Sequence, residues 1–553
     1  MTEKAHCNPR GPEWLAVLAA CTLASAAAVV WSWQNGAMMN YGDAIAHLHI
    51  TRRVFDSHQP RLTQLGSVWL PLPHLLMLPF VQVYSWWANG AAALPASILA
   101  YLAACAGIYR LARRWLSPAA SALALAFFAL NPNLLYLQTT AMTEPLFVCE
   151  MIWVAVGLVE WRDCLETDER KAGRLQAWIA VALIAAIFTR YDGWVMALIA
   201  WSGIGLALLR RGRLRSPGFW VASFFVVAAP LAWFVYNAVG FGDWLYFMRG
   251  PYSAKAIEIR TAAHGDGPPH PGWHNPWVSL LFFVKAAELD AFAAWGNLLL
   301  ALSVLGTAWA WFMARRHGFL WALLLWLPVP FYAYSIAYGS VPIFLPPWWP
   351  HSHYNLRYGM EMLPAFALGL GFVAQFGLAA VREFKTSWPK YAAALLFALI
   401  GLNSWRMIQA RPLVYVEGTK NNQARRQYEI EIPPALRNLL VTRPGGVVLM
   451  ETSVYPELVS LTGIPLRQTI NESDLEIYEE ALRAPAAHAA IVLAFDGDEI
   501  DRAIKACPAG LTPVRRFTLA GQPSGTMYVS GTPFATGLLG KPGAVVASGK
   551  ETR

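Results

Sequence analysis

Long apolar runs and short polar interruptions alternate along most of the chain. The runs are roughly 15 to 23 residues long, and the charged residues gather between them. A run of that length matches a helix that crosses a hydrocarbon core of about 30 Å. Inside lipid the backbone must satisfy its own hydrogen bonds, so the spans are expected to be helical. The pattern therefore predicts a polytopic α-helical membrane protein.

We expect about eleven transmembrane helices. The first covers Trp14 to Trp33, behind the basic residues Lys4 and Arg10. A basic flank before the first span predicts a cytoplasmic N-terminus. A signal peptide with small residues near Ala24 to Ala28 is the alternative, and it also puts the next segment outside. The other ten predicted spans are 94–109, 119–136, 145–161, 175–189, 194–209, 219–236, 291–312, 319–338, 359–381 and 391–407.

The apolar segment from Trp69 to Trp87 decides the orientation of everything after it. Three prolines interrupt this segment. A spanning segment would put the arginines of 110–114 outside, against the positive-inside rule. An interfacial segment puts them, and the later basic loops, in the cytoplasm. We therefore predict an interfacial first outer loop over residues 34–90.

The predicted domains follow from this topology. Residues 1–13 form a cytoplasmic N-terminus and residues 14–410 the transmembrane domain. Short apolar runs at 446–451, 490–495 and 526–530 alternate with helical patterns at 474–482 and 499–507, which predicts a small extracytoplasmic α/β domain over residues 411–531. The composition of residues 532–553 predicts a disordered tail. The outer loop from 240 to about 285 is rich in Pro, Gly and His, which favours a mobile cover.

Composition narrows the function. The sequence is 56% hydrophobic and only 14% charged, which argues against a soluble protein. The net charge of +9 is concentrated in short loops, where it sets orientation, so we expect no nucleic-acid partner. The six cysteines show neither zinc spacing nor a disulfide pair on the outer side. The α/β domain lacks a glycine-rich phosphate loop, so we assign it no nucleotide.

Two outward-facing carboxylates are candidates for catalysis. Asp43 follows the first span, in a segment that reads as an amphipathic surface helix with His47 on the same face. Glu144 stands where a span begins, and a carboxylate beside an apolar helix needs a partner or a function. The alternative for both is a structural one, in which Asp43 caps its helix and Glu144 interacts with a helix dipole.

Two outward-facing arginines, Arg190 and Arg357, are candidates for a phosphate site. Each alone reads equally well as a side chain that reaches up to a lipid phosphate. Together on the face that carries the carboxylates, with aromatic residues beside them, they predict a site for a phosphate with a lipid tail. The expected substrate-binding residues are Tyr41, His47, Tyr191, Asp192, His351, His353, Tyr354, Tyr358 and Glu361.

Four histidines raise the question of a metal. His47, His49, His351 and His353 stand as His-x-His pairs near the candidate carboxylates. A helical ligand pair is missing, however. We expect no cofactor and keep a divalent metal as the alternative.

The order of these features resembles the membrane-integral C-type glycosyltransferases (GT-C), in particular the superfamily of protein O-mannosyltransferases and aminoarabinose transferases. The resemblance covers residues 14 to about 408. The segments that carry it are Tyr41-Gly42-Asp43, Trp69-Leu70-Pro71-Leu72-Pro73-His74, Met142-Thr143-Glu144-Pro145-Leu146 and Thr189-Arg190-Tyr191-Asp192-Gly193. One departure is Ala44, because many relatives have two adjacent acidic residues there. It weakens any second acidic role at this position.

The resemblance implies a GT-C-like fold and a mannosyltransferase-like enzyme of the cell envelope. Such an enzyme moves a sugar from a polyprenyl-phosphate donor to a hydroxyl or amine of a lipid, glycan or protein acceptor, at the outer face of the plasma or inner membrane. The first-loop acidic residue, Asp43, would be the base.

The residues fit this chemistry independently. Displacement at the anomeric carbon needs a base for the acceptor proton, here Asp43, and cations for the leaving phosphate, here Arg190 and Arg357. A single base without a carboxylate nucleophile predicts inversion. A transporter or flippase of a lipid-linked substrate is the main alternative, and it would place ionisable residues near the middle of its spans. A structural or assembly protein predicts no clustered site.

Overall fold

The computed structural model describes residues 11–262, 268–314 and 318–531. The predicted tail 532–553 and residues 1–10 of the predicted N-terminal segment lie outside the described residues. The chain divides into two compact units. The helical unit comprises residues 1–51 and 65–422, and the C-terminal unit comprises residues 52–64 and 423–553.

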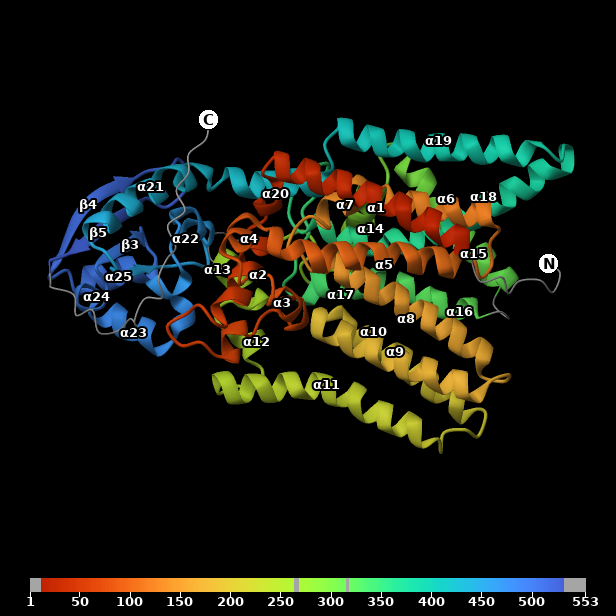
Figure 1. Cartoon of the computed structure of the whole chain (residues 1–553), viewed down its shortest axis with the longest axis horizontal. Helices are drawn as coiled ribbons and strands as arrows, with labels where there is room; N and C mark the ends of the chain where they lie inside the picture. Colours follow the sequence, from red (N-terminus) through yellow and green to blue (C-terminus); the bar gives the residue numbers. More distant parts are fainter. Residues whose placement is uncertain (1–10, 263–267, 315–317, 532–553) are drawn as a thin grey trace. The chain divides into compact units, whose positions relative to one another are not determined.

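Long helices lie side by side in the helical unit (Figure 1). Within the described residues, nine helical stretches are long and apolar enough to cross a membrane. Eight of these stretches correspond to the long helices α1 (Gly11–Gln34), α5 (Leu94–Ala112), α9 (Glu169–Thr189), α10 (Asp192–Leu209), α11 (Pro217–Phe241), α15 (Gly296–Ala314), α18 (Leu363–Phe384) and α19 (Trp388–Gln409), and the ninth, Phe319–Tyr338, is a run of shorter helices. A further long helix, α8 (Glu144–Cys164), is not among the nine. The protein is therefore an integral, multi-pass membrane protein.

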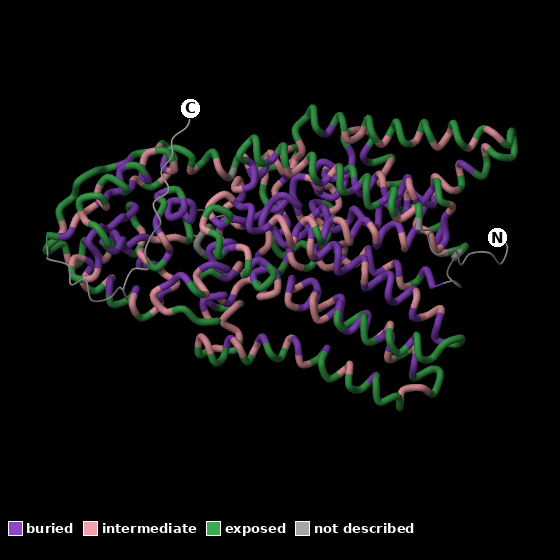
Figure 2. Tube along the Cα trace, in the orientation of Figure 1, coloured by how far each residue is buried: buried purple, intermediate pink, exposed green. Residues whose placement is uncertain are grey.

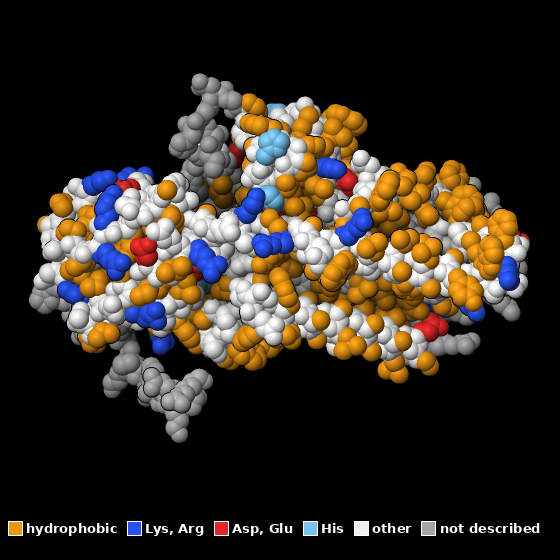
Figure 3. Space-filling view, turned by 90° about the horizontal axis from the view of Figure 1, so that it is seen from above, with side chains coloured by type: hydrophobic (Ala, Val, Ile, Leu, Met, Phe, Trp, Pro, Cys, Tyr) orange, Lys and Arg blue, Asp and Glu red, His pale blue; other side chains and the backbone are white. Residues whose placement is uncertain are grey.

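The apolar helices of the bundle differ in how far they are buried. Helices α5 and α8 are largely buried among their neighbours, whereas α11 and α19 are mostly exposed (Figure 2). The exposed side chains are apolar, for example Phe224, Val239 and Leu395. Hydrophobic side chains also cover the helical bundle on the face shown in Figure 3. A helix that is apolar on every side is expected where its outer face meets lipid.

Two predicted spans depart from the nine. The expected span 119–136 is broken into α6 (Pro118–Ala129) and α7 (Pro132–Leu137). The break has a local cause, because the Asn131 side chain accepts hydrogen bonds from the backbone N–H groups of Asn133 and Leu134 and so starts a new helix. The expected span 145–161 corresponds to α8. That helix has 21 residues, which is long enough to cross a membrane. It is not among the nine apolar stretches, and its sequence contains several acidic residues.

The first outer loop and the long outer loop contain more helix than the sequence predicts. The proline-rich segment forms α3 (Leu72–Met77) and α4 (Tyr84–Asn89), and six residues are too few to cross a membrane. The expected mobile cover 240–285 is wrong in part. It contains α12 (Tyr246–Arg249), α13 (Ala254–Ala262) and most of α14 (Pro276–Ala291). Helix α14 buries Phe282, Phe283 and Ala286, so it is a packed element.

The two ends of the bundle differ in chemistry. Helix α8 begins at Glu144 and ends near Asp163, which pairs with Arg114. At this second end Arg110 pairs with Glu160, Arg113 with Glu13 and Arg211 with Glu166. The basic loops therefore collect at one end of the helical unit. Glu144 marks the opposite end, where the turn between α9 and α10 also lies.

Three shorter helices complete the helical unit: α16 (Phe319–Ala322), α17 (Pro328–Tyr338) and α20 (Leu413–Gln423). The sequence placed residues from 411 onward in the C-terminal domain, but α20 lies in the helical unit. Its Val414 N–H donates to Asn133 Oδ1 at 2.9 Å, and its Val414 carbonyl accepts from Tyr41 Oη at 2.6 Å. These bonds fix the last helix before the C-terminal unit.

The C-terminal unit is a small α/β fold. Its five-stranded sheet has the order β2-β1-β3-β5-β4, parallel from β2 to β3 and antiparallel at β5 and β4. The strands are β1 (Val448–Met450), β2 (Thr469–Ile470), β3 (Ile491–Phe495), β4 (Leu511–Phe517) and β5 (Gly525–Ser530). The helices are α21 (Arg426–Thr442), α22 (Glu457–Thr462), α23 (Glu476–Arg483), α24 (Pro485–His488) and α25 (Glu499–Ala506).

Part of the first outer loop belongs to this C-terminal unit. Asp56 accepts hydrogen bonds from the backbone N–H groups of Leu466 and Arg467, both at 3.3 Å. Asp56 also pairs with Arg52 at 2.7 Å. Helix α2 (Gly42–Arg53) thus begins in the helical unit and ends in a segment that Asp56 anchors to the C-terminal unit.

Candidate active site

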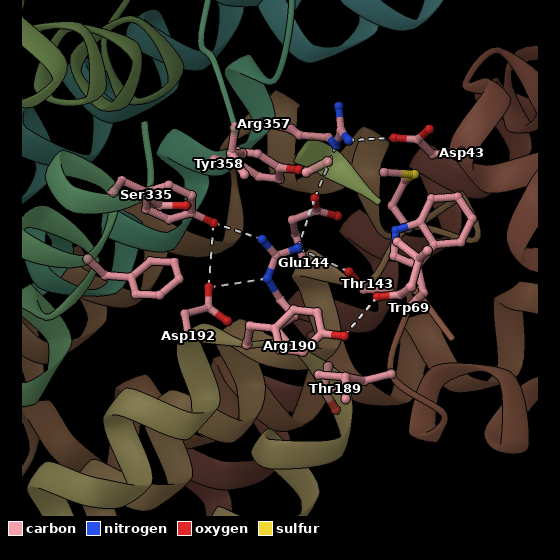
Figure 4. Close-up of a pocket in the computed structure, with 18 of the residues that line it drawn as sticks. Asp43, Trp69, Thr143, Glu144, Thr189, Arg190, Asp192, Ser335, Arg357 and Tyr358 are labelled. Carbon is pink, nitrogen blue, oxygen red and sulfur yellow. Dashed lines mark hydrogen bonds and ion pairs between the residues drawn. The ribbon is translucent and has the colours of Figure 1, made fainter. Parts of the chain in front are cut away.

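A cavity of about 220 Å³ opens at the end of the bundle that carries Glu144 (Figure 4). This volume is below the range of about 300–1,000 Å³ that is usual for drug-sized ligands, so it suits a headgroup better than a whole lipid-linked molecule. Its lining includes the polar residues Asp43, His47, Thr143, Glu144, Thr189, Arg190, Asp192, Ser335 and Arg357. Aromatic residues of its wall are Trp69, Tyr191, Phe331, Tyr332 and Tyr358.

Arg357 is held by three carboxylates. Its Nη2 lies 2.6 Å from Asp43 Oδ2, its Nε 3.1 Å from Glu144 Oε1 and its Nη1 2.9 Å from Glu417 Oε1. The ring of Tyr41 lies 5.3 Å from the guanidinium carbon. Every side of the planar fork therefore has a partner, which fixes the direction of the group.

Arg190 forms a second network on the opposite side of Glu144. Its Nη1 lies 3.3 Å from Glu144 Oε1, and its Nε lies 3.3 Å from Asp192 Oδ2. Its Nη2 donates to Tyr332 Oη at 2.7 Å and lies 3.4 Å from Glu361 Oε1. Tyr332 in turn donates to Glu361 at 2.8 Å.

Glu144 and Tyr358 connect the two arginines. The Glu144 side chain is only 1% exposed, and its Oε1 accepts from both guanidinium groups. The Tyr358 ring lies 5.0 Å from the guanidinium carbon of Arg190 and 5.0 Å from that of Arg357. A shared carboxylate and a shared aromatic face therefore place the two cations along one wall of the cavity.

Helix ends supply these side chains. Asp43 lies in the first turn of α2, and Glu144 in the first turn of α8 behind Thr143. Arg190 lies between α9 and α10, and its backbone N–H closes α9 on the Ala186 carbonyl at 3.1 Å. Arg357 lies in the 3₁₀ helix η6 (Leu356–Met362), just before α18. Polar residues at helix ends occur both as helix caps and in functional sites. Their spacing in the sequence alone therefore does not distinguish a cap from a site residue.

His47 lies at the edge of the cavity in a histidine pair. Its Nδ1 lies 2.9 Å from His74 Nε2, and its ring centroid is 4.4 Å from that of Trp69. Burial, together with the positive charges of Arg357 and Arg190, lowers the pKa of His47 to about 3. His47 is therefore neutral at physiological pH, and the proline-rich segment packs against it.

The structure brings most of the predicted site residues together. Asp43, Glu144, Arg190 and Arg357 line one cavity with His47, Tyr191, Asp192 and Tyr358. Tyr41 and Glu361 stand behind the arginines.

Besides Tyr41 and Glu361, three more predicted residues do not line the cavity. His351 is exposed and contacts the Pro346 carbonyl. His353 Nδ1 lies 3.1 Å from Lys420 Nζ, and Tyr354 packs on Phe344. Their loop comes close in sequence to Arg357, which is why the pattern grouped them with it. Their role in substrate binding stays a prediction.

Two residues of the networks were missed by the sequence reasoning. Tyr332 lies inside a predicted span, where a single hydroxyl gives little signal. Glu417 lies beyond the last predicted span, so it was assigned to the C-terminal domain. The sequence feature that could have pointed to Glu417 is that it is the only acidic residue of α20. A lone acid in a short helix right after a span needs a partner or a function, as Glu144 does.

The acidic residues of the site pair with arginine. Among the described residues, no three His, Cys, Asp or Glu side chains meet in an arrangement that fits a metal ion. The oxygens of Asp43, Glu144 and Asp192 that point into the networks face guanidinium groups. The site is therefore built from carboxylate–guanidinium pairs.

The fold is GT-C-like, because it resembles that of ArnT in two solved structures. ArnT from Cupriavidus metallidurans bound to undecaprenyl phosphate has a TM-score of 0.55 at 13% identity, over 94% of this chain and 99% of that one. Its apo form has a TM-score of 0.53 at 14% identity, over 96% and 99% of the two chains. The likeness confirms the fold that the sequence predicts.

A third structure is more distant. The oligosaccharyltransferase of Archaeoglobus fulgidus, in complex with Zn and sulfate, has a TM-score of 0.46 at 11% identity, over 93% of this chain and 73% of that one. No protein-family model matches the sequence, and no curated protein matches it either.

Proposed function

We propose that this protein is an inverting glycosyltransferase that uses a polyprenyl-phosphate sugar as donor. The observation that carries the proposal is the ion pair of Asp43 with Arg357 on the wall of a cavity where Arg190 supplies a second cation. Support also comes from the ArnT fold, one structure of which holds undecaprenyl phosphate. Two fixed guanidinium groups suit a phosphate, because each presents paired N–H donors to its oxygens.

Asp43 is the general base of the proposed reaction. Its side chain is 45% exposed, whereas that of Glu144 is 1% exposed. The acceptor oxygen or nitrogen forms a bond to the anomeric carbon as the bond from that carbon to the donor phosphate oxygen breaks. The acceptor proton passes to Asp43, and the electron pair leaves with the polyprenyl phosphate. With one displacement the anomeric configuration inverts.

Arg190 and Arg357 stabilise the phosphate as it leaves. Their positions are set before any substrate binds, so the transition state gains their charge without reorganisation of the site. Glu144 keeps the two cations at a fixed separation. Its buried carboxylate offsets part of their positive charge, which lowers the repulsion between them.

The reaction is assigned to the extracytoplasmic face. The basic loops with Arg110, Arg114 and Arg211 lie at the end of the bundle opposite Glu144. Under the positive-inside rule that end faces the cytoplasm. The candidate site, and with it the C-terminal unit that follows α20, is then outside.

A transfer assay tests the proposal. Purified full-length protein is incubated with radiolabelled polyprenyl-phosphate mannose, or with other polyprenyl-phosphate sugars, and an extract of envelope lipids and proteins. We expect label on an acceptor and release of free polyprenyl phosphate. Glu160→Gln is the matched control, because Glu160 pairs with Arg110 at the opposite end of α8. Label moved across a vesicle membrane without release of polyprenyl phosphate would instead identify a transporter.

A further inference from the structure

Glu417 is a buried carboxylate that stands behind Arg357 and outside the cavity. The residue is fully buried, and it is absent from the cavity lining. Both of its oxygens have partners. Oε1 accepts from Arg357 Nη1 and from the Asn355 N–H, both at 2.9 Å, and Oε2 accepts from the Leu356 N–H at 3.0 Å. Glu417 therefore holds the guanidinium and the backbone that carries it.

We infer that Glu417 is the positioning residue that keeps Arg357 directed at the donor phosphate. The inference rests on the proposed function. Glu417 acts through Arg357, because it has no surface in the cavity. It is not a catalytic residue, and its effect is on where the cation points.

The need for such a residue follows from the contacts of Arg357. A donor phosphate reaches Arg357 from the cavity, on the side where the half-exposed Asp43 now pairs with Nη2. When the phosphate takes this place, Glu144 and Glu417 are the two carboxylates that still hold the arginine. Glu144 is shared with Arg190, whereas among the arginines Glu417 pairs with Arg357 alone. Of these two carboxylates, Glu417 is therefore the one that pairs with no cation other than Arg357 among the described residues.

The backbone around Arg357 supports this assignment. Asn355 has φ +56°, a left-handed conformation that is uncommon for residues other than glycine. The carboxylate of Glu417 accepts the N–H groups on both sides of this turn. Charge-assisted bonds to two successive N–H groups define the start of η6, and Arg357 is its second residue. The turn and the cation are thus fixed by one side chain.

Helix α20 in turn fixes Glu417. Val414, one turn earlier, is bonded to Asn133 and Tyr41. Gly418 packs so closely that a Cβ there would lie 3.0 Å from the Tyr41 ring. Tyr41 is also the ring under the Arg357 guanidinium. The carboxylate is therefore carried by a helix that is closely packed against the first outer loop.

A comparison of two lipids isolates the proposed role. We measure binding of a short-chain polyprenyl phosphate and of the corresponding polyprenol, which lacks the phosphate, to the full-length protein in nanodiscs. The ratio of the two affinities reports the phosphate contribution alone. We expect Glu417→Ala to lower this ratio by about 10- to 100-fold, by analogy with the loss seen when the hydrogen-bond partner of a metal-ligating side chain is removed. Polyprenol binding should stay at the wild-type value.

Glu417→Gln provides the second variant. An amide has one acceptor oxygen in place of two, so one N–H group or the guanidinium must face the amide NH₂. Simple electrostatics predicts the opposite sign, because removal of a negative charge beside Arg357 should strengthen phosphate binding. A reduced ratio in Glu417→Gln therefore supports positioning, and an increased ratio overturns it.

The remaining outcomes are distinct. Glu160→Gln should leave the ratio unchanged, since Glu160 lies sixteen residues beyond Glu144 on α8, or about 24 Å along the axis. Equal loss of both lipids in the Glu417 variants would show a structural role and overturn the inference. A wild-type ratio in both variants would overturn it as well. A wild-type protein that does not distinguish the two lipids would instead contradict the proposed donor.

Discussion

Asp43 Oδ2 lies 2.6 Å from Arg357 Nη2, and the two side chains differ greatly in exposure, at 45% for Asp43 and 6% for Arg357. Water can solvate the half-exposed Asp43 carboxylate once it leaves Arg357, so this partner is the easiest of the three to release. The buried partners of Arg357 are far harder to remove, because they would leave an unpaired charge inside the protein. In the proposed reaction we therefore expect the donor phosphate to displace Asp43 from Arg357 and to leave Glu144 in place. The carboxylate released in this way is the proposed base.

The first prediction concerns Asp43→Asn. This change removes the proposed base, so transfer should fall by about 10² to 10⁴-fold. It also removes the anion that competes for Arg357, so binding of polyprenyl phosphate should be retained or strengthened by a few fold. Transfer is measured with radiolabelled donor, and binding by titration in nanodiscs. Turnover at the wild-type rate would remove Asp43 from the mechanism, and loss of binding would show that Asp43 helps to hold the donor.

The second prediction is a double-mutant cycle on the buried pair. Arg357→Ala leaves the carboxylates of Glu144 and Glu417 without this cation, which should cost about 3–5 kcal/mol of unfolding free energy. Arg357→Ala combined with Glu417→Gln should cost less than the sum of the two single changes, because the second change removes one stranded charge. Thermal unfolding in detergent measures all four proteins. Additive losses would show that the pair is not coupled.

The third prediction concerns Gly193, in the turn that carries Arg190. A Cβ at this position would lie 2.2 Å from the backbone oxygen of Ala186, and that backbone cannot give way cheaply. Gly193→Ala should therefore disturb both Arg190 and Asp192, with a large fall in transfer and in melting temperature. Gly173→Ala in α9 is the matched control, because nothing lies within 4 Å of its Cβ. The control should be neutral or stabilise the helix by about 0.5–1 kcal/mol.

The sequence was most informative where charged residues stand at the ends of long apolar runs. Apolar runs predict the long helices, and isolated charges at their ends predict Asp43, Glu144, Arg190 and Arg357. The pattern cannot show that Asn131 breaks a span, because a capping side chain looks like any polar residue in an apolar run. Nor can it show that Glu417 turns back toward Arg357. That contact joins residues 60 positions apart and depends on how α20 packs.

The fourth prediction concerns the protonation of His47. Burial and the nearby arginines lower its pKa in the folded protein to about 3, whereas an unfolded histidine has a pKa of about 6.5. The folded state thus binds the proton less well, so the stability linked to His47 is complete above pH 6.5 and is lost as the pH falls toward 3. The loss should approach about 1.4 kcal/mol for each pH unit.

His47→Gln removes this titration. The melting temperature of the wild type, minus that of the variant, should be largest at pH 7.5 and should shrink steadily toward pH 4. Thermal unfolding in buffers of constant ionic strength gives both curves. A difference that does not change with pH would contradict a neutral, buried His47.

The last prediction lies in the C-terminal unit, where Glu457 at the start of α22 is 3% exposed. Burial, with the nearby carboxylate of Glu429, raises the pKa of Glu457 to about 7, although Arg425 acts in the opposite direction. The folded state here binds the proton better than the unfolded chain does. The stabilising contribution is therefore complete below about pH 4.5 and is lost as the pH rises through 7.

Glu457→Gln keeps the uncharged form at every pH. At pH 8.5 the variant should protect the amides of α22 against hydrogen exchange better than the wild type, by on the order of 1–3 kcal/mol. At pH 4 the two proteins should exchange nearly alike, because Glu457 is then largely protonated in both the folded and the unfolded state. Glu479→Gln, at an exposed position on α23, controls for loss of a negative charge. Equal protection of wild type and variant at pH 8.5 would contradict the prediction. It would show that ionised Glu457 does not lower the stability of α22, because its ion pair with Arg425 compensates for burial.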